Sequence, residues 1–150
     1  MKSEKSDYLK YWRVVRYYVK ARYELSECEL EMILFLYTED YFSKDKFAEF
    51  NDLMSWNKDR FESLRQRGWI CVFRKRMGKR KALYELSYKA KRMVTNIYKK
   101  LLGEEIVVTR TNNPLFKKNI SSTDKVYAEM IRTMNKSIKE KRVKYGNDLL

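Results

Sequence analysis

Apolar residues recur at intervals of three and four along most of this 150-residue chain, which is the period of an α-helix with one buried face. The first such segment covers residues 7–23, and the same spacing returns in five later segments. Those segments are residues 26–38, 43–54, 57–67, 87–102 and 123–138. The pattern therefore predicts six helices, and the content of one Pro and four Gly agrees with a mainly helical chain.

Capping residues predict where several of these helices begin and end. Ser26 and Glu29 have the spacing of a capping box, in which the serine hydroxyl and the glutamate carboxylate satisfy two free amides. Ser55 or Asn57 can start the fourth helix, and Gly68 can end it in the left-handed conformation. The fourth helix is therefore bounded closely by its own local sequence.

Two short apolar runs separate the fourth and fifth helical segments. Residues 69–73 read Trp-Ile-Cys-Val-Phe, residues 82–86 read Ala-Leu-Tyr-Glu-Leu, and the basic stretch 74–81 between them contains Gly78. Two such strands with a glycine in the turn predict a β-hairpin. The order of elements predicts a mainly α fold with a small β-hairpin: a winged helix-turn-helix with additional N- and C-terminal helices.

The segment that follows the fifth helix has a different character. Residues 104–122 contain a β-branched run at 106–109 and a turn signal at 112–114. We therefore expect a winged-helix domain at residues 1–103 that includes the N-terminal helix, a connector at 104–122, and a C-terminal helix with a charged tail at 123–150.

Positive charge is concentrated around the hairpin. Residues 58–92 carry thirteen Lys and Arg against three Asp and Glu, a balance of +10 in a chain of net charge +14. A solvated turn is the alternative, but six cations within eight positions repel one another, which favours contact with phosphates. The residues expected to make that contact are Arg74, Lys75, Arg76, Lys79, Arg80 and Lys81.

The fourth helix is expected to read bases, because the second helix of a helix-turn-helix contacts DNA through its N-terminal residues. The candidate readers are Ser55, Trp56, Asn57, Lys58 and Arg60, with Arg65 on the flank. The alternative for Trp56, Asn57 and Lys58 is ordinary capping and packing. Asp59 and Glu62 weaken this face for DNA. Such an acid can read a cytosine amino group, but more often it is neutral filler or a partner for Arg65 or Arg67.

The chain lacks the residues that most catalytic and metal sites need. It contains no His, no glycine-rich phosphate loop, and only two cysteines, Cys28 and Cys71, without the paired spacing of a zinc site. We expect no enzymatic activity and no cofactor. Both cysteines are most simply small apolar packing residues in a reducing compartment, and the alternative for either is a redox-sensing thiol. No apolar run approaches the length of a bilayer span, so we expect a soluble cytoplasmic or virus-associated protein without membrane contact.

Three stretches carry a resemblance to the MarR family of winged-helix regulators. Residues 25–34 resemble the family's second helix, residues 60–70 its recognition-helix ending, and residues 86–90 its exit from the wing, with Ala90 in place of Gly. The resemblance is strongest from Leu25 to Leu102 and covers about half the chain. The wing departs from the family pattern, because its tip has no acidic residue.

The resemblance also implies a homodimer formed by the terminal helices and, in many relatives, a small aromatic effector. The bulky stripes of the first and sixth helices agree with an intersubunit contact, and the alternative is packing within one chain. The expected dimerisation residues are Trp12, Val15, Val19, Tyr127, Ile131, Met134 and Ile138. No polar constellation in the sequence identifies an effector.

Two functions therefore stay open. The first is a non-enzymatic, sequence-specific, double-stranded DNA-binding transcriptional regulator, dimeric, with the recognition helix in the major groove and the basic wing on phosphates. The second is a winged-helix assembly or scaffold protein, cellular or viral, that uses the basic surface for non-specific nucleic acid or an acidic partner.

Overall fold

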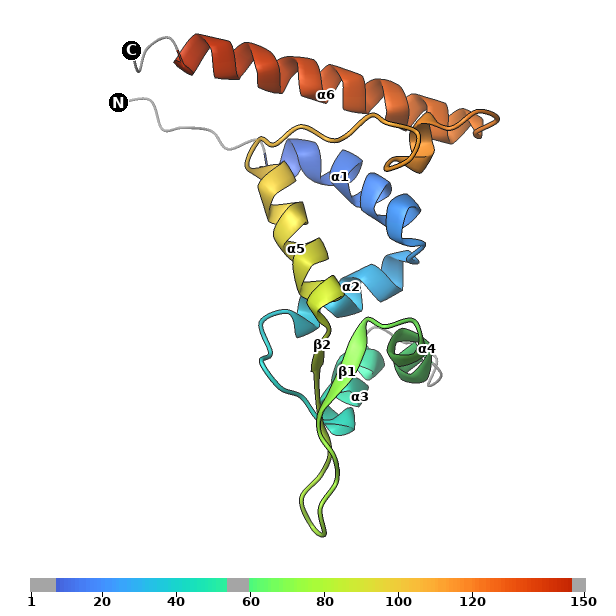
Figure 1. The fold of residues 1–150 in the computed structure, drawn as a ribbon, viewed down its shortest axis with the longest axis vertical. Helices are drawn as coiled ribbons and strands as arrows, with labels where there is room; N and C mark the ends of the chain where they lie inside the picture. The colour runs from blue at the N-terminus through green and yellow to red at the C-terminus, as the bar shows by residue number, and fades with distance from the viewer. Residues whose placement is uncertain (1–7, 54–59, 147–150) are drawn as a thin grey trace. The chain divides into compact units, whose positions relative to one another are not determined.

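The computed structural model describes residues 8–53 and 60–146, with side chains up to residue 143. Six α-helices and one two-stranded antiparallel hairpin occur in these ranges, which confirms the expected fold class. The elements are α1 (Tyr8–Tyr23), α2 (Glu27–Leu36), α3 (Lys44–Leu53), α4 (Arg60–Gln66), β1 (Ile70–Arg74), β2 (Leu83–Leu86), α5 (Tyr88–Leu101), the short 3-10 helix η1 (Pro114–Phe116) and α6 (Ser122–Gly146) (Figure 1).

The chain divides into two compact units. Residues 25–95 form one, here called the central unit, and residues 1–24 with 96–150 form the other, here called the terminal unit. This division groups α1 with α6, whereas the sequence pattern placed the N-terminal helix with the winged helix. The grouping follows from the contacts that α1 makes with α6 and η1.

The central unit is a winged helix in which α2, α3 and α4 precede the hairpin. Its first helix begins at the expected capping box: the Ser26 hydroxyl accepts a hydrogen bond from the Glu29 amide at 3.1 Å, and the Glu29 carboxylate accepts one from the Ser26 amide at 2.9 Å. The same carboxylate is buried and pairs with Arg67 at 2.7 Å. The cap of α2 is thereby tied to the end of α4.

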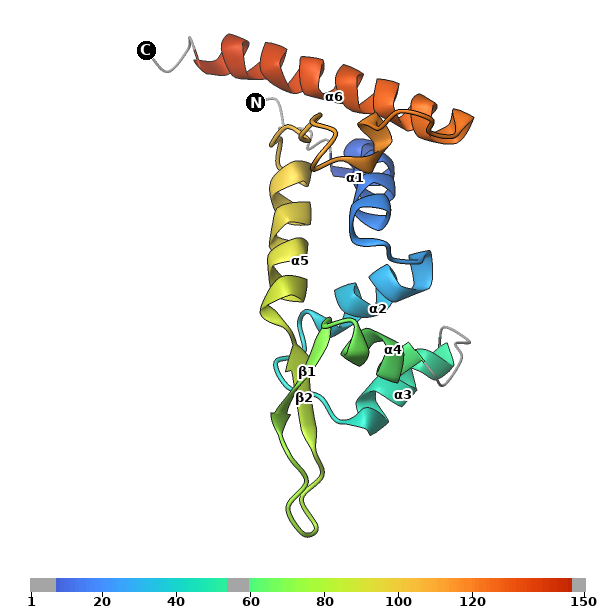
Figure 2. The same cartoon turned by 45° about the vertical axis from the view of Figure 1, so that its right-hand side comes forward.

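The hairpin packs on α4 through aromatic rings. Phe61 meets Tyr84 of β2 edge-on with 4.9 Å between ring centroids, and Leu64 is fully buried. Phe42 forms an isolated antiparallel bridge with Tyr84, which the sequence did not predict. The Phe42 amide donates to the Tyr84 carbonyl at 2.9 Å, and the Tyr84 amide donates to the Phe42 carbonyl at 2.8 Å. Figure 2 shows α3 and α4 lying together beside the hairpin, whose tip extends away from both helices.

The terminal unit is built on the packing of α1 against α6. Their apolar stripes cover each other, and the stripe residues Val15 and Ile131 are fully buried. At the edge of this contact, Tyr17 stacks on Tyr127 with 3.7 Å between ring centroids, and its hydroxyl donates a hydrogen bond to Asp124 at 2.6 Å. The two helices are thus joined by both apolar and polar contacts.

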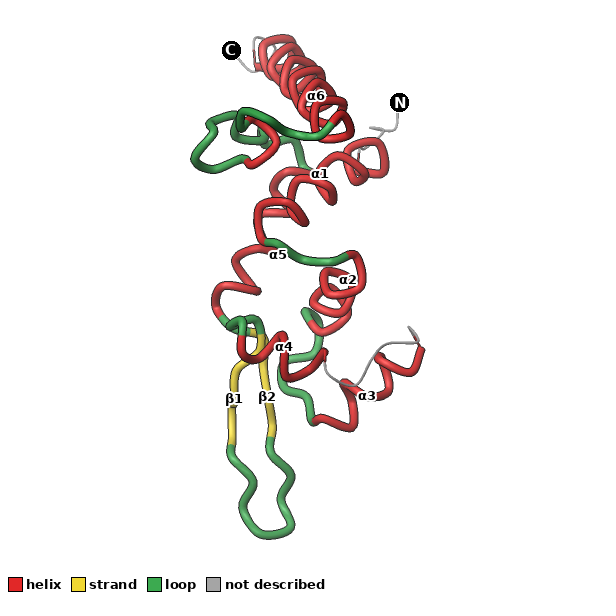
Figure 3. Tube along the Cα trace, turned by 90° about the vertical axis from the view of Figure 1, so that its right-hand side faces the viewer, coloured by secondary structure: helices red, strands yellow, loops and turns green. Residues whose placement is uncertain are grey.

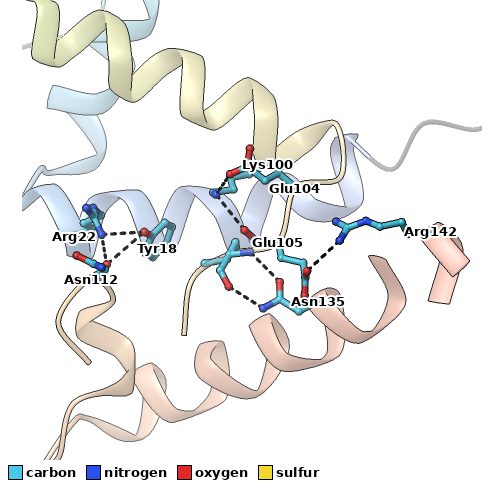
Figure 4. A network of polar contacts seen from close by, with 9 residues as sticks. Tyr18, Arg22, Lys100, Glu104, Glu105, Asn112, Asn135 and Arg142 are labelled. Carbon is cyan, nitrogen blue, oxygen red and sulfur yellow. Dashed lines mark hydrogen bonds and ion pairs between the residues drawn. The ribbon is translucent and has the colours of Figure 1, made fainter. Parts of the chain in front are cut away.

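Two buried asparagines determine the path of the connector. The side chain of Asn135 on α6 accepts a hydrogen bond from the Ile106 amide at 2.9 Å and donates one to the Ile106 carbonyl at 2.8 Å (Figure 4). Asn113 donates to the Val107 carbonyl at 2.8 Å and caps η1 by accepting from the Leu115 amide at 3.0 Å. The segment therefore follows α6 closely, although it contains no strand.

Candidate nucleic-acid interface

The hairpin tip is a tight turn with the cations on its outside. Met77 and Arg80 exchange backbone hydrogen bonds of 3.2 and 3.0 Å, which leaves Gly78 and Lys79 as a two-residue loop. Gly78 has a φ of +59°, as the first loop position of a type II′ turn requires, and glycine adopts this conformation without strain. Figure 3 shows that this tip continues beyond the paired strands.

The wing cations are almost unpaired. Five of the six are exposed, and Arg74 is half-buried with its guanidinium donating to the Lys81 carbonyl at 3.2 Å. Among the described residues the wing makes one ion pair, between Lys81 and Asp45 of α3. Four exposed cations have no ion pair in that part of the chain: Lys75, Arg76, Lys79 and Arg80. Because like charges repel here, a bound polyanion would lower the electrostatic energy of the tip.

Helix α4 buries one face and presents the other. Phe61 and Leu64 are buried as expected, while Glu62, Arg65 and Gln66 are exposed. Glu62 pairs with Arg65 at 3.9 Å and with Lys44 of α3 at 3.7 Å. This confirms the expectation that the acid pairs with a neighbouring cation, and its charge is therefore compensated.

The expected base readers fall into two groups. Ser55, Trp56, Asn57 and Lys58 lie outside the described residues. Arg60 is described, and its guanidinium donates a hydrogen bond of 3.0 Å to the Ser26 hydroxyl. Its side chain is therefore engaged at the start of α2, a contact that the pattern of α4 alone did not indicate.

The wing and α4 belong to the same compact unit and are braced against each other. The Lys81–Asp45 pair links the wing to α3, and the Phe61–Tyr84 contact links α4 to β2. A rigid body that carries both elements is what a groove-binding helix with a phosphate-binding hairpin needs.

The expected dimerisation residues lie largely inside one chain. Five of the seven, namely Val15, Val19, Ile131, Met134 and Ile138, are between 0% and 5% exposed. Trp12 is half-buried with Arg16 over its ring, and Tyr127 stacks on Tyr17. The five side chains are buried because α1 and α6 pack against each other. They therefore offer no free surface to a partner.

An apolar groove remains beside that contact. It encloses about 620 Å³, and its lining includes Tyr11, Val14, Val126 and Met130 from α1 and α6. The Tyr11 hydroxyl is buried and has no hydrogen-bond partner in the described part of the chain. This groove is one apolar surface of the terminal unit that a partner could cover.

The net charge is distributed unevenly between the two units. Residues 25–95 carry fifteen Lys and Arg against eleven Asp and Glu, a balance of only +4, because residues 25–57 hold two basic and eight acidic residues. The terminal unit carries nineteen against nine, a balance of +10. Most of the chain's net charge therefore lies outside the winged helix, although the wing is its densest cluster.

The remaining candidate chemistry is sparse in the described residues. Burial, followed by the charge of Glu85, raises the pKa of the Cys71 thiol, which opposes the thiolate that a redox sensor needs. Residues 8–53 and 60–146 contain no cluster of three or more Cys, Asp or Glu that could hold a metal ion. None of the helices in those ranges has the length and hydropathy needed to cross a bilayer.

Comparison with known protein families and with curated proteins finds no match for this chain. Among solved structures, one described as "Structure of Disulfide formed AbfR" is similar. The two share 10% sequence identity and align with a TM-score of 0.44 over 92% of this chain and 88% of the other. A likeness of this size does not bear on what the chain binds.

Proposed function

We propose that this protein is a non-enzymatic, sequence-specific, double-stranded DNA-binding transcriptional regulator. The observation that carries the proposal is the wing: six cations within eight positions, of which one has an ion pair in the described residues, on the same compact unit as α4. A bound phosphate backbone offsets their repulsion, and a duplex presents phosphates in a continuous row.

The wing and the fourth helix have different roles in this proposal, as the winged-helix geometry implies. The wing contacts phosphates and supplies affinity that does not depend on sequence, while the N-terminal turn of the fourth helix contacts base edges. Asn57 and Lys58 are the proposed readers, because amide and ammonium groups suit adenine and guanine edges in the major groove. Arg60 has a smaller part in this proposal, since its guanidinium already bonds Ser26.

We also propose that the regulator is a homodimer, joined along the apolar groove between α1 and α6. Covering that groove would remove Val126, which is 58% exposed, from water and would offer a partner to the buried Tyr11 hydroxyl. Two recognition helices related by a two-fold axis would then match a palindromic operator.

The central experiment measures affinity for duplex DNA as a function of salt. If the wing of each subunit in a dimer neutralises about four phosphates, the two wings together contribute about −7 to the slope of the logarithm of affinity against the logarithm of salt. Replacing Lys75, Arg76, Lys79 and Arg80 with Gln should weaken binding to every duplex and flatten the slope by about 3 to 4 per subunit. The matched control replaces four exposed cations elsewhere in the chain with Gln: Lys91, Arg92, Lys99 and Arg110.

The same assay separates a regulator from an assembly protein. A regulator should prefer one palindrome, selected from randomised duplexes, over random DNA by at least about a thousandfold. Sedimentation of the free protein should give the mass of two chains. Absence of any sequence preference, together with a protein partner that stays bound in high salt, would instead identify a scaffold. Equal losses in the wing variant and the control would overturn the role of the wing.

A further inference from the structure

The exposed side of α6 carries a straight row of cations. Lys125, Arg132, Lys136 and Lys139 follow at intervals of seven, four and three, which places them on one face of a helix. All four are exposed. At about 1.5 Å per residue the row is about 21 Å long.

The connector widens this row into a surface. A groove of about 640 Å³ is lined by Arg132, Lys136 and Lys139 on one side and by connector residues 104–109 on the other. Further along, the Arg132 guanidinium lies 5.0 Å from the centre of the Phe116 ring, so the next two connector residues, Lys117 and Lys118, lie near the row. Both are exposed. We call these six cations the α6–connector surface.

Three acids beside this surface are engaged in ion pairs. Glu129 pairs with Arg132. Glu105 pairs with Lys139 and with Arg142, in both cases at 3.4 Å, and Figure 4 shows the pair with Arg142. Glu104 pairs with Lys100 at 2.5 Å. Four cations of the surface have no ion pair within the described ranges: Lys117, Lys118, Lys125 and Lys136. The surface therefore keeps a strong positive potential after its internal pairs are counted.

The surface is also held in shape. Its connector side is fixed to α6 by the two hydrogen bonds of the Asn135 side chain to Ile106, both buried. A rigid row of cations loses little conformational freedom on binding beyond that of the lysine side chains themselves. Its length of about 21 Å matches about six base-pair steps of B-form DNA at about 3.4 Å per step.

We propose that the α6–connector surface is a second DNA-binding surface, which contacts the phosphate backbone of duplex DNA without reading its sequence. The inference rests on the proposed function, because a duplex held by the wing brings phosphates to a high local concentration around the whole chain. It places nucleic-acid contacts on the terminal unit, which the resemblance to winged-helix regulators assigns to dimerisation alone.

The test compares three full-length variants, each lacking four positive charges, on one 30-base-pair duplex across a series of salt concentrations. The surface variant replaces Lys117, Lys118, Lys136 and Lys139 with Gln, because Lys125 also lines the groove between α1 and α6. The wing variant and the four-cation control are those described above. Fluorescence anisotropy gives affinity and salt slope, and circular dichroism verifies folding. We expect the surface variant to lose at least about tenfold in affinity and to flatten the slope by at least about 2 per subunit, well beyond the control.

The outcomes separate this inference from the proposed function. A surface variant that behaves like the control, beside a wing variant that loses affinity, overturns the second surface and leaves the wing's role intact. A loss in the surface variant alone supports the second surface and overturns the role of the wing. Losses that match the control in both variants overturn both. A parallel titration with polyglutamate distinguishes the partner: equal binding of this polymer, lost in the surface variant, would assign the surface to an acidic protein.

Discussion

Asn135 offers a sharp test of how the terminal unit is held together. Its side chain is 8% exposed and satisfies both backbone polar groups of Ile106, which is itself 1% exposed. No regular secondary structure provides those groups with another partner, because residues 104–109 belong to no helix or strand. Asn135→Ala would therefore leave a buried amide and a buried carbonyl without hydrogen bonds.

The size of the effect follows from the number of groups left unsatisfied. Each buried donor or acceptor that loses its partner costs about 1–3 kcal/mol, so the two together predict a loss of about 2–6 kcal/mol. A chain of this length has a total stability of about 7–20 kcal/mol at about 0.05–0.15 kcal/mol per residue. The substitution should therefore be a major destabilisation, larger than a surface change by several kcal/mol.

Urea unfolding followed by circular dichroism measures the loss, and hydrogen exchange followed by mass spectrometry locates it. Exchange should rise first in residues 104–109 and the adjoining part of α6. Asn112→Ala is the matched control, because Asn112 is exposed and accepts hydrogen bonds from Tyr18 and Arg22 through its backbone carbonyl. It should stay within about 0.5 kcal/mol of the parent protein. A loss below about 1 kcal/mol for Asn135→Ala would refute the reasoning.

Two further predictions concern the winged-helix core and the α1–α6 contact. Leu64→Ala should lower the free energy of unfolding by about 2–5 kcal/mol in urea titrations, because Leu64 is fully buried and anchors α4; an effect under 1 kcal/mol would contradict that packing. The hydrogen bond to Asp124, together with burial, raises the pKa of Tyr17 from 10.0 to about 12. The folded state thus favours the protonated hydroxyl, and this contribution is complete below pH 10 and is lost as the pH rises through about 12. Tyr17→Phe should make stability less dependent on pH between 10 and 12, and absorbance at 295 nm should show one fewer late-titrating tyrosine; an unchanged titration would show that the bond is not formed.

Much of the local structure was predictable because it depends on neighbours in the chain. The capping box of Ser26 and Glu29 needs residues three apart, and the turn at Gly78 needs a residue that tolerates a positive φ. Helical periodicity likewise identified the buried positions of α4, Phe61 and Leu64. The composition of residues 74–81 alone makes the wing cationic, and the structure adds that five of its six cations are exposed.

The tertiary structure decided which surfaces meet. Periodicity predicted apolar stripes on α1 and α6, but a stripe does not specify its partner. In the structure the two helices pack against each other within one chain. The single bridge between Phe42 and Tyr84 leaves no alternating pattern, so no sequence signal marks it. The hydrogen bond between Arg60 and Ser26 joins residues 34 positions apart, and the sequence pattern did not predict it either.

The sequence by itself therefore determined the kinds of element, their caps and the density of charge at the wing. The tertiary structure determined the path of the connector and the row of cations that it shares with α6. The physical reason is range: propensity, capping and turn chemistry act over a few residues, whereas the placement of Asn135 against Ile106 depends on a contact across 29 positions. Only folding brings such distant groups together. The second cationic surface exists because folding places the connector beside α6.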